Sequence, residues 1–129
     1  MTRHVFLSFV IEDEDRVNLF RGQAKNKRLD LAFDDYSVRT PYNSQDAGYI
    51  RSRITERLKA ASVTICLVGP TTATSAWVDW ELEKSYELGN RVFGVQLYGD
   101  RACPSPSALR THNARVLAWD VDQIVRVIG

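Results

Sequence analysis

The chain has 129 residues, of which 44% are hydrophobic, and its 17 Lys and Arg against 16 Asp and Glu give a formal net charge of +1. This composition predicts one globular domain over residues 1–129 and excludes a disordered chain. The balanced charge argues against a protein dedicated to nucleic acid or to a membrane surface, which would carry a basic excess. No apolar run approaches the ~18 residues of a membrane span, and the first residues lack the apolar region of a signal peptide.

The chain alternates between strand-like and helix-like patterns. In chain order, the predicted elements are a strand at 5–10, a helix that follows the acids at 12–15, a strand at 29–33, a helix over 50–61, a strand at 63–69, a helix over 76–88, a strand at 91–98, a strand at 114–119 and a helix over 121–128. Two long loops are expected, a polar one at 34–48 and one at 99–113 with room for a single turn of helix.

Strands that alternate with helices predict an α/β fold. The expected architecture is a flavodoxin-like three-layer domain, with a central five-stranded parallel sheet covered by helices on both faces. In such sheets, ligands bind outside the carboxyl ends of the strands. Those ends are predicted at residues 9–10, 33–35, 69–71, 98–99 and 119–120.

The few cysteines and histidines limit the chemistry. Two cysteines are too few for a secreted disulfide scaffold, so a cytoplasmic protein is expected. Cys66 lies inside an apolar run and is interpreted as a small core residue. His4 and His112 are too scattered for a histidine-based metal site, and we expect His112 to face solvent and no metal to be bound.

Several ligand-binding motifs are absent from the sequence. No G-x-G-x-x-G follows the first strand, and neither a P-loop nor a G-x-S-x-G elbow occurs. A phospho-receiver domain would need an acid at the end of the third strand, where residues 68–70 read Val-Gly-Pro. A flavodoxin would need a hydroxyl-rich phosphate loop after the first strand, where the acids of residues 11–14 would repel phosphate.

The strongest local signal opens the helix after the third strand. Ser75 is a good N-cap there, and Trp77 and Glu81 are four residues apart and so share one ridge of the helix. A Trp ring beside a carboxylate at this sheet edge could stack a planar ligand and hold its charge. The alternative is that Trp77 serves packing and Glu81 is one of four solvated acids between residues 79 and 87.

These residues resemble a TIR domain, in particular the TIR-like domain of the ThsB proteins of bacterial Thoeris anti-phage defence, over essentially the whole chain. Val5 to Phe9 matches the family's opening strand, and Phe33-Asp34 matches the end of its second strand. Residues 35–48 stand where the family has its BB loop, and Ile65 to Val68 followed by Ser75-Ala76-Trp77 matches its third strand and S-x-W motif. Trp77 to Glu81 matches the W-x-x-x-E of NAD-consuming members, whose glutamate is catalytic.

The resemblance implies an NAD glycohydrolase or ADP-ribosyl cyclase. It would cleave the nicotinamide–ribose bond of NAD and cyclise ADP-ribose into a second messenger, which activates a separate effector protein in antiviral defence. NAD is then the substrate, and no cofactor is expected. The implied catalytic residue is Glu81, and the expected substrate-binding residues are Phe6, Ser8, Phe9, Asp34 and Trp77.

The implied roles within the site differ. Phe6, Ser8 and Phe9 would line the nicotinamide–ribose side, Trp77 would stack the transferred portion, and the loop at 35–48 would gate the adenine side. Asp34 would order the site or, equally well, cap a turn, and Trp80 is as much a candidate for packing or an interface as for a functional role. The alternative function is a non-catalytic TIR-like module that signals by self-association, and self-association is expected in either case.

Overall fold

The computed structural model describes residues 2–36 and 41–129, in which five parallel strands form one sheet of order β2-β1-β3-β4-β5. The strands are β1 (Arg3–Ser8), β2 (Leu31–Asp34), β3 (Val63–Val68), β4 (Arg91–Gln96) and β5 (Val116–Leu117). This order and direction confirm the predicted flavodoxin-like α/β fold.

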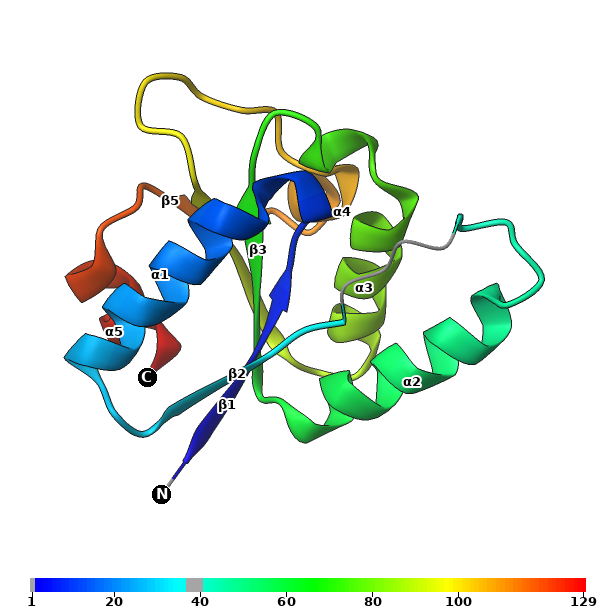
Figure 1. Cartoon of the computed structure of the whole chain (residues 1–129), viewed down its shortest axis with the longest axis horizontal. Coiled ribbons are helices and arrows are strands. Elements are labelled where there is room, and N and C mark those ends of the chain that lie inside the picture. Colours follow the sequence, from blue (N-terminus) through cyan, green and yellow to red (C-terminus); the bar gives the residue numbers. More distant parts are fainter. Residues whose placement is uncertain (1, 37–40) are drawn as a thin grey trace.

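Helices cover both faces of the sheet (Figure 1). The first face carries α1 (Glu14–Lys27) and α5 (Val121–Ile128), and the second carries α2 (Ala47–Ala60), α3 (Ala76–Glu87) and the short α4 (Ser107–Thr111). Two 3-10 turns, η1 (Ile11–Asp13) and η2 (Thr72–Thr74), follow β1 and β3 at their carboxyl ends. None of the helices in the described ranges has the length and apolar content that crossing a membrane requires.

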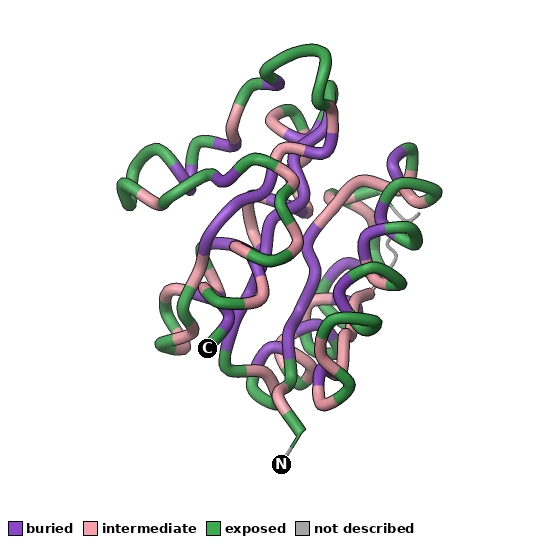
Figure 2. Tube along the Cα trace, turned by 90° about the vertical axis from the view of Figure 1, so that its left-hand side faces the viewer, coloured by how far each residue is buried: buried purple, intermediate pink, exposed green. Residues whose placement is uncertain are grey.

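Side chains that alternate along each strand divide the core into two sides. Val5 and Leu7 of β1 pack in the cluster under α1 and α5, whereas Phe6 packs with residues of α2 on the opposite face. Figure 2 shows the strands as the buried centre of the molecule, with exposed residues on the outer sides of the helices. This alternation directs Ser8, like Phe6, toward the face that α2 and α3 cover.

Several boundaries differ from the predicted ones. β2 begins at Leu31 because Leu29 is 86% exposed in the turn before it. β5 has two residues instead of the six predicted at 114–119, since only Val116 and Leu117 pair with β4 at this edge of the sheet. The loop predicted at 34–48 ends at Ala47, where α2 begins, and residues 37–40 of that loop lie outside the described residues. The loop predicted at 99–113 was expected to have room for one turn of helix, and α4 occupies that place.

Candidate active site

A cavity of about 370 Å³ opens at the carboxyl ends of β1, β2 and β3, beside the first turns of α3. This is the edge of the sheet where the fold predicts ligand binding. Both polar and aromatic side chains contribute to its wall. The lining residues are Phe9, Val10, Ile11, Glu12, Tyr36, Thr71, Thr74, Ser75, Trp77 and Glu81.

The most unusual group in this wall is the Glu81 carboxyl. Glu81 is only 4% exposed, and Ser8 Oγ donates a hydrogen bond of 2.7 Å to its Oε1. Burial raises the pKa of Glu81 to about 8, the hydrogen bond from Ser8 lowers it, and the negative charge of Asp35 raises it. A carboxyl that resists ionisation yet borders a cavity is a candidate for chemistry, because a cationic ligand would stabilise its charged form.

Hydrogen bonds before and after Glu81 order the helix α3 that carries it. Ser75 caps the helix as predicted, since its hydroxyl accepts a hydrogen bond of 3.2 Å from the backbone N–H of Val78. Further along the helix, the Ser85 hydroxyl lies 2.8 Å from the backbone oxygen of Glu81 and 2.9 Å from Thr64 Oγ1 on β3. The contact between Ser85 and Thr64 joins α3 to β3 one helical turn after Glu81 and holds the helix in register with the sheet.

The four acids of α3 do not share one environment. Asp79, interpreted as a solvated acid, instead accepts hydrogen bonds of 2.9 Å from Ser107 Oγ and 3.1 Å from the backbone N–H of Ala108, at the start of α4. Glu83 and Glu87 are exposed, as expected. Only Glu81 is buried, so the alternative that it is one more solvated acid is wrong.

Trp77 lies in the cavity wall one helical turn before Glu81. Its ring makes an edge-on contact with Tyr42, with centroids 5.0 Å apart, and a second edge-on contact with Trp80 at 6.4 Å. Trp80 packs against the buried cluster under α2, which supports packing as its role. Trp77 therefore stands between that cluster and the cavity, with part of its surface available to a ligand.

The other residues predicted for substrate binding fall into different places. Phe9 lines the cavity, and Ser8 is fully buried and reaches the site through Glu81. Phe6 is fully buried and packs with the apolar face of α2, so the structure does not place it in the cavity wall as predicted. The reason is its depth in β1, three residues before Phe9 and on the side that α2 covers.

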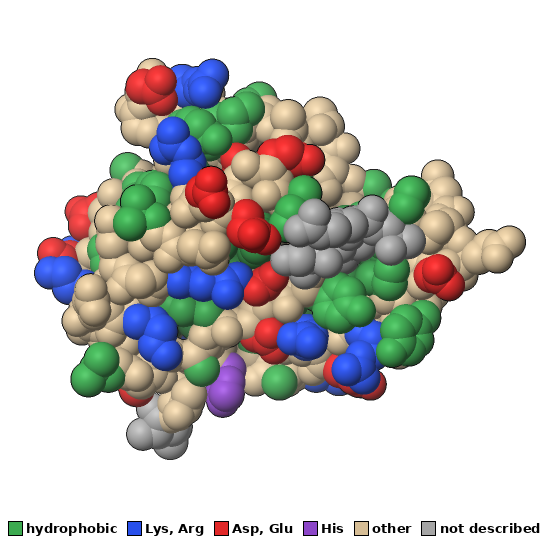
Figure 3. Space-filling model, in the orientation of Figure 1, with side chains coloured by type: hydrophobic (Ala, Val, Ile, Leu, Met, Phe, Trp, Pro, Cys, Tyr) green, Lys and Arg blue, Asp and Glu red, His purple; other side chains and the backbone are tan. Residues whose placement is uncertain are grey.

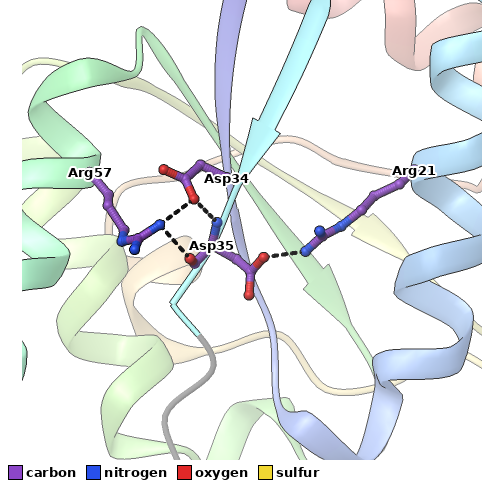
Figure 4. A network of polar contacts seen from close by, with 4 residues as sticks. All are labelled: Arg21, Asp34, Asp35 and Arg57. Atoms are coloured by element: carbon purple, nitrogen blue, oxygen red, sulfur yellow. Dashed lines mark hydrogen bonds and ion pairs between the residues drawn. The ribbon is translucent and has the colours of Figure 1, made fainter.

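Asp34 also lies outside the lining of this cavity. Its Oδ1 accepts hydrogen bonds of 2.6 Å from Arg57 Nη1 on α2 and 2.9 Å from the backbone N–H of Asp35 (Figure 4). These contacts bind the Asp34 carboxylate to α2 and to the next residue of the chain.

Sequence reasoning did not assign Glu12 and Tyr36 to the site. Glu12 was interpreted as a helix-starting acid, but it lies in η1 and lines the cavity. Tyr36 follows the end of β2, and its position at a strand's carboxyl end was the available signal.

Outside the cavity, Cys66 and His112 lie where the sequence predicts them. Cys66 is fully buried, which confirms its interpretation as a core residue. His112 is exposed as expected but stacks on Tyr86 with ring centroids 3.7 Å apart. On the face drawn in Figure 3, acidic and basic side chains are interspersed, in keeping with the balanced net charge.

Comparison with known proteins identifies the family. The model of the family described as "Thoeris protein ThsB, TIR-like domain" matches residues 6–102, a range that includes both Ser8 and Glu81. A curated relative from Bacillus cereus (strain MSX-D12), named "Putative cyclic ADP-D-ribose synthase ThsB1", is 31% identical over 102 residues, which cover 75% of this chain and 53% of the relative. The chain thus spans about half the length of this relative.

Solved structures agree on the fold. The TIR domain of the Toll-related receptor TRR-2 from Hydra magnipapillata superposes with a TM-score of 0.60 at 20% identity, over 96% of this chain and 89% of that one. The TIR domains of the activated Roq1 resistosome superpose with a TM-score of 0.55 at 18% identity, over 98% of this chain and 69% of that one. From the family match together with this fold, we conclude that the chain belongs to the TIR-like domains of the Thoeris protein ThsB.

Proposed function

We propose that this domain cleaves the nicotinamide–ribose bond of NAD and cyclises the ADP-ribose, with Glu81 as the catalytic carboxylate. The observation that carries the proposal is the burial of the Glu81 carboxyl, held by Ser8, in the wall of a cavity that it shares with Trp77. The name of the Bacillus cereus relative, "Putative cyclic ADP-D-ribose synthase ThsB1", supports the same chemistry.

The charge changes of this reaction suit a single buried carboxylate. Cleavage passes through an oxocarbenium-like transition state, as in glycoside hydrolysis. The nicotinamide enters as a cationic pyridinium and leaves as a neutral molecule, so it needs no general acid. An ionised Glu81 would bind the ribose hydroxyls and stabilise the positive charge that develops on the sugar. The substrate's own positive charge would in turn favour the ionised form of Glu81.

The cavity limits which part of NAD can be enclosed. A volume of about 370 Å³ is at the lower end of the range for small-molecule sites, so it suits the nicotinamide ribose better than the whole dinucleotide. Phe9 and Trp77 supply aromatic surface beside Glu81. The remainder of NAD would extend past Tyr36, toward the segment that continues after β2.

Cyclisation requires that a hydroxyl or ring atom of the bound ligand reaches the anomeric carbon before water does. We assign to Trp77 the stacking of the transferred portion, which sets the attacking atom. The cyclic product would pass to a separate effector protein in antiviral defence, and the protein would self-associate through TIR contacts. A Trp77→Ala variant should then yield a larger share of linear ADP-ribose, measured by chromatography of the products.

The decisive experiment incubates concentrated protein with NAD and separates the products. The wild type should consume NAD and release nicotinamide, and Glu81→Gln, which keeps the size of the side chain, should lose at least about a hundredfold in rate. Glu83→Gln is the matched control, because it makes the same change at an exposed acid of the same helix. Intact NAD with the wild type would support the non-catalytic module instead. An unchanged rate in Glu81→Gln would refute the role of the glutamate.

A further inference from the structure

An ion-pair network holds the chain where it leaves β2, and two helices supply its cations. Arg21 of α1 forms an ion pair with the Asp35 carboxylate, and Arg57 of α2 binds Asp34 (Figure 4). Arg57 Nη1 also donates to the backbone oxygen of Asp35 at 3.3 Å. The two neighbouring carboxylates are thus turned toward helices on opposite faces of the sheet.

Each of these arginines also lies near an aromatic ring of the cavity wall. The Arg57 guanidinium is 5.2 Å from the centroid of the Tyr36 ring, and the Arg21 guanidinium is 6.0 Å from the centroid of the Phe9 ring, both within reach of a cation–π interaction. Phe9 follows β1 and lines the cavity, and Asp35 precedes Tyr36, which also lines it. The side chains of Arg21 and Asp35 are only 28% and 18% exposed, so this pair is screened less by solvent than an exposed ion pair.

We propose that Arg21 is a positioning residue for the active site, which holds Phe9 and Asp35 in place and balances the negative charge that Asp35 presents to Glu81. The inference rests on the proposed function of Glu81 but names a residue outside the cavity wall. Arg21 would act through Asp35 and Phe9 and would not touch the substrate.

Among the groups that surround Glu81, Asp35 is the one whose charge Arg21 neutralises by direct contact. From β1, Ser8 donates its hydrogen bond, and from β3 the buried Cys66 thiol stays neutral because burial raises its pKa. From η1, Glu12 lines the same cavity. The negative charge of Asp35 raises the pKa of Glu81, and the Arg21 guanidinium lies against that carboxylate. Removal of the cation would therefore let the charge of Asp35 act more fully on Glu81.

The test is the pH dependence of kcat/KM for NAD in a set of variants. Arg21→Gln should shift the acidic limb to higher pH by about half a unit, which is about a threefold loss of kcat/KM below the limb and little loss above it. Asp35→Asn should shift the limb to lower pH, because the amide oxygen can still accept from Arg21 but carries no charge. The double variant Arg21→Gln/Asp35→Asn should follow Asp35→Asn.

Matched variants separate charge from packing. Arg21→Lys keeps the cation and should keep the limb in place. Arg57→Gln releases Asp34, which does not contribute to the shifted pKa of Glu81, and should leave the limb unmoved even if KM changes. Arg53→Gln alters an exposed arginine that pairs with Glu56 on α2 and should behave as the wild type. Thermal unfolding of each variant shows that it is folded at the assay temperature.

A second measurement keeps this inference distinct from the proposed function. The side-chain carboxyl carbon of Glu81, followed by NMR in the protein without NAD, should titrate at higher pH in Arg21→Gln than in the wild type. If the wild type leaves NAD intact but this titration shifts, the proposed function fails and the positioning role stands. If neither the titration nor the kinetic limb moves in Arg21→Gln, the positioning role is overturned, whatever the activity of the wild type.

Discussion

Ser8 on β1 and Glu81 on α3 are separated by 73 positions in the chain and are joined by a buried hydrogen bond of 2.7 Å. The bond connects the sheet to the helix at the inner end of the cavity. It also opposes the effect of burial, because a hydroxyl that donates to a carboxylate favours the charged form. The contact therefore controls both where the carboxyl points and how easily it ionises.

The first prediction concerns this contact. Ser8→Ala should raise the pKa of Glu81 further and lower kcat/KM for NAD at pH 7 by roughly tenfold, since a hydrogen bond to a charged group contributes about 1.5–3 kcal/mol. Part of the activity should return at pH 9 or above, where Glu81 ionises without help. Ser107→Ala is the control, because that hydroxyl binds the carboxylate of Asp79 at the surface. A loss in Ser8→Ala that is equal at every pH would contradict the role of the hydroxyl in ionisation.

The second prediction is the pH profile of the wild type. The pKa of Glu81 is raised to about 8 in the free protein, so kcat/KM should rise with pH and level off above that value. The limb in kcat should lie at lower pH, because the cationic nicotinamide favours the ionised carboxylate in the complex. Steady-state rates between pH 6 and pH 9.5 provide the measurement. Identical limbs in the two parameters would show that the pyridinium does not lie near Glu81.

The third prediction concerns stability against pH. A carboxyl whose pKa is raised on folding binds a proton in the folded state at pH values where the unfolded chain has released it. Stability should therefore fall as pH rises from 4.5, the ordinary pKa of a glutamate, to about 8, by up to about 1.4 kcal/mol per pH unit, and then level off. Glu81→Gln should flatten this fall in melting temperature, and Glu83→Gln should not.

Asp13 should also contribute to the fall in stability with rising pH, and its contribution remains in Glu81→Gln. Its pKa is raised by burial, and its carboxyl accepts a hydrogen bond of 3.0 Å from Tyr98. The melting temperature of Glu81→Gln should thus still decline slightly with rising pH. A decline in Glu81→Gln as steep as that of the wild type would mean that Glu81 is ionised in the folded protein throughout this range.

The fourth prediction concerns the packing that supports η1 in the cavity wall. A Cβ added to Gly69 would clash with Asp13 Oδ2, so the buried carboxyl would have to move. Gly69→Ala should destabilise the protein by about 1–3 kcal/mol in chemical denaturation, as overpacking commonly does. Gly22→Ala on the exposed side of α1, where a Cβ would have no atom within 4 Å, should instead stabilise by up to about 1 kcal/mol.

A double variant checks that the clash involves Asp13. In Gly69→Ala/Asp13→Ala the new methyl group has room. The double variant should therefore lose less unfolding free energy than the two single variants lose in total. Strict additivity would place the cost of Gly69→Ala elsewhere than at Asp13.

The amino-acid sequence determined the architecture because the signals for it are local. The buried runs of β3 and β4, the spacing of Ile50, Ile54 and Leu58, and the cap at Ser75 each depend on neighbours within a few residues. The edges were harder to predict. Leu29 and the residues around Val116 belong to segments rich in strand-forming residues. Whether such a segment pairs at the edge of a sheet depends on tertiary contacts, which strand propensity alone cannot predict.

For the site, spacing alone placed Trp77 and Glu81 on one ridge of a helix at the correct edge of the sheet. Only the tertiary structure decided that Glu81 is buried and bonded to Ser8 while Asp79 binds the start of α4, since acids on one helix differ only in what packs against them. It likewise placed Phe6 under α2 and brought Arg21 to Asp35, because such contacts join segments that folding alone brings together. Local pattern sets which residues can share a face, and long-range packing sets what that face meets and how its charges behave.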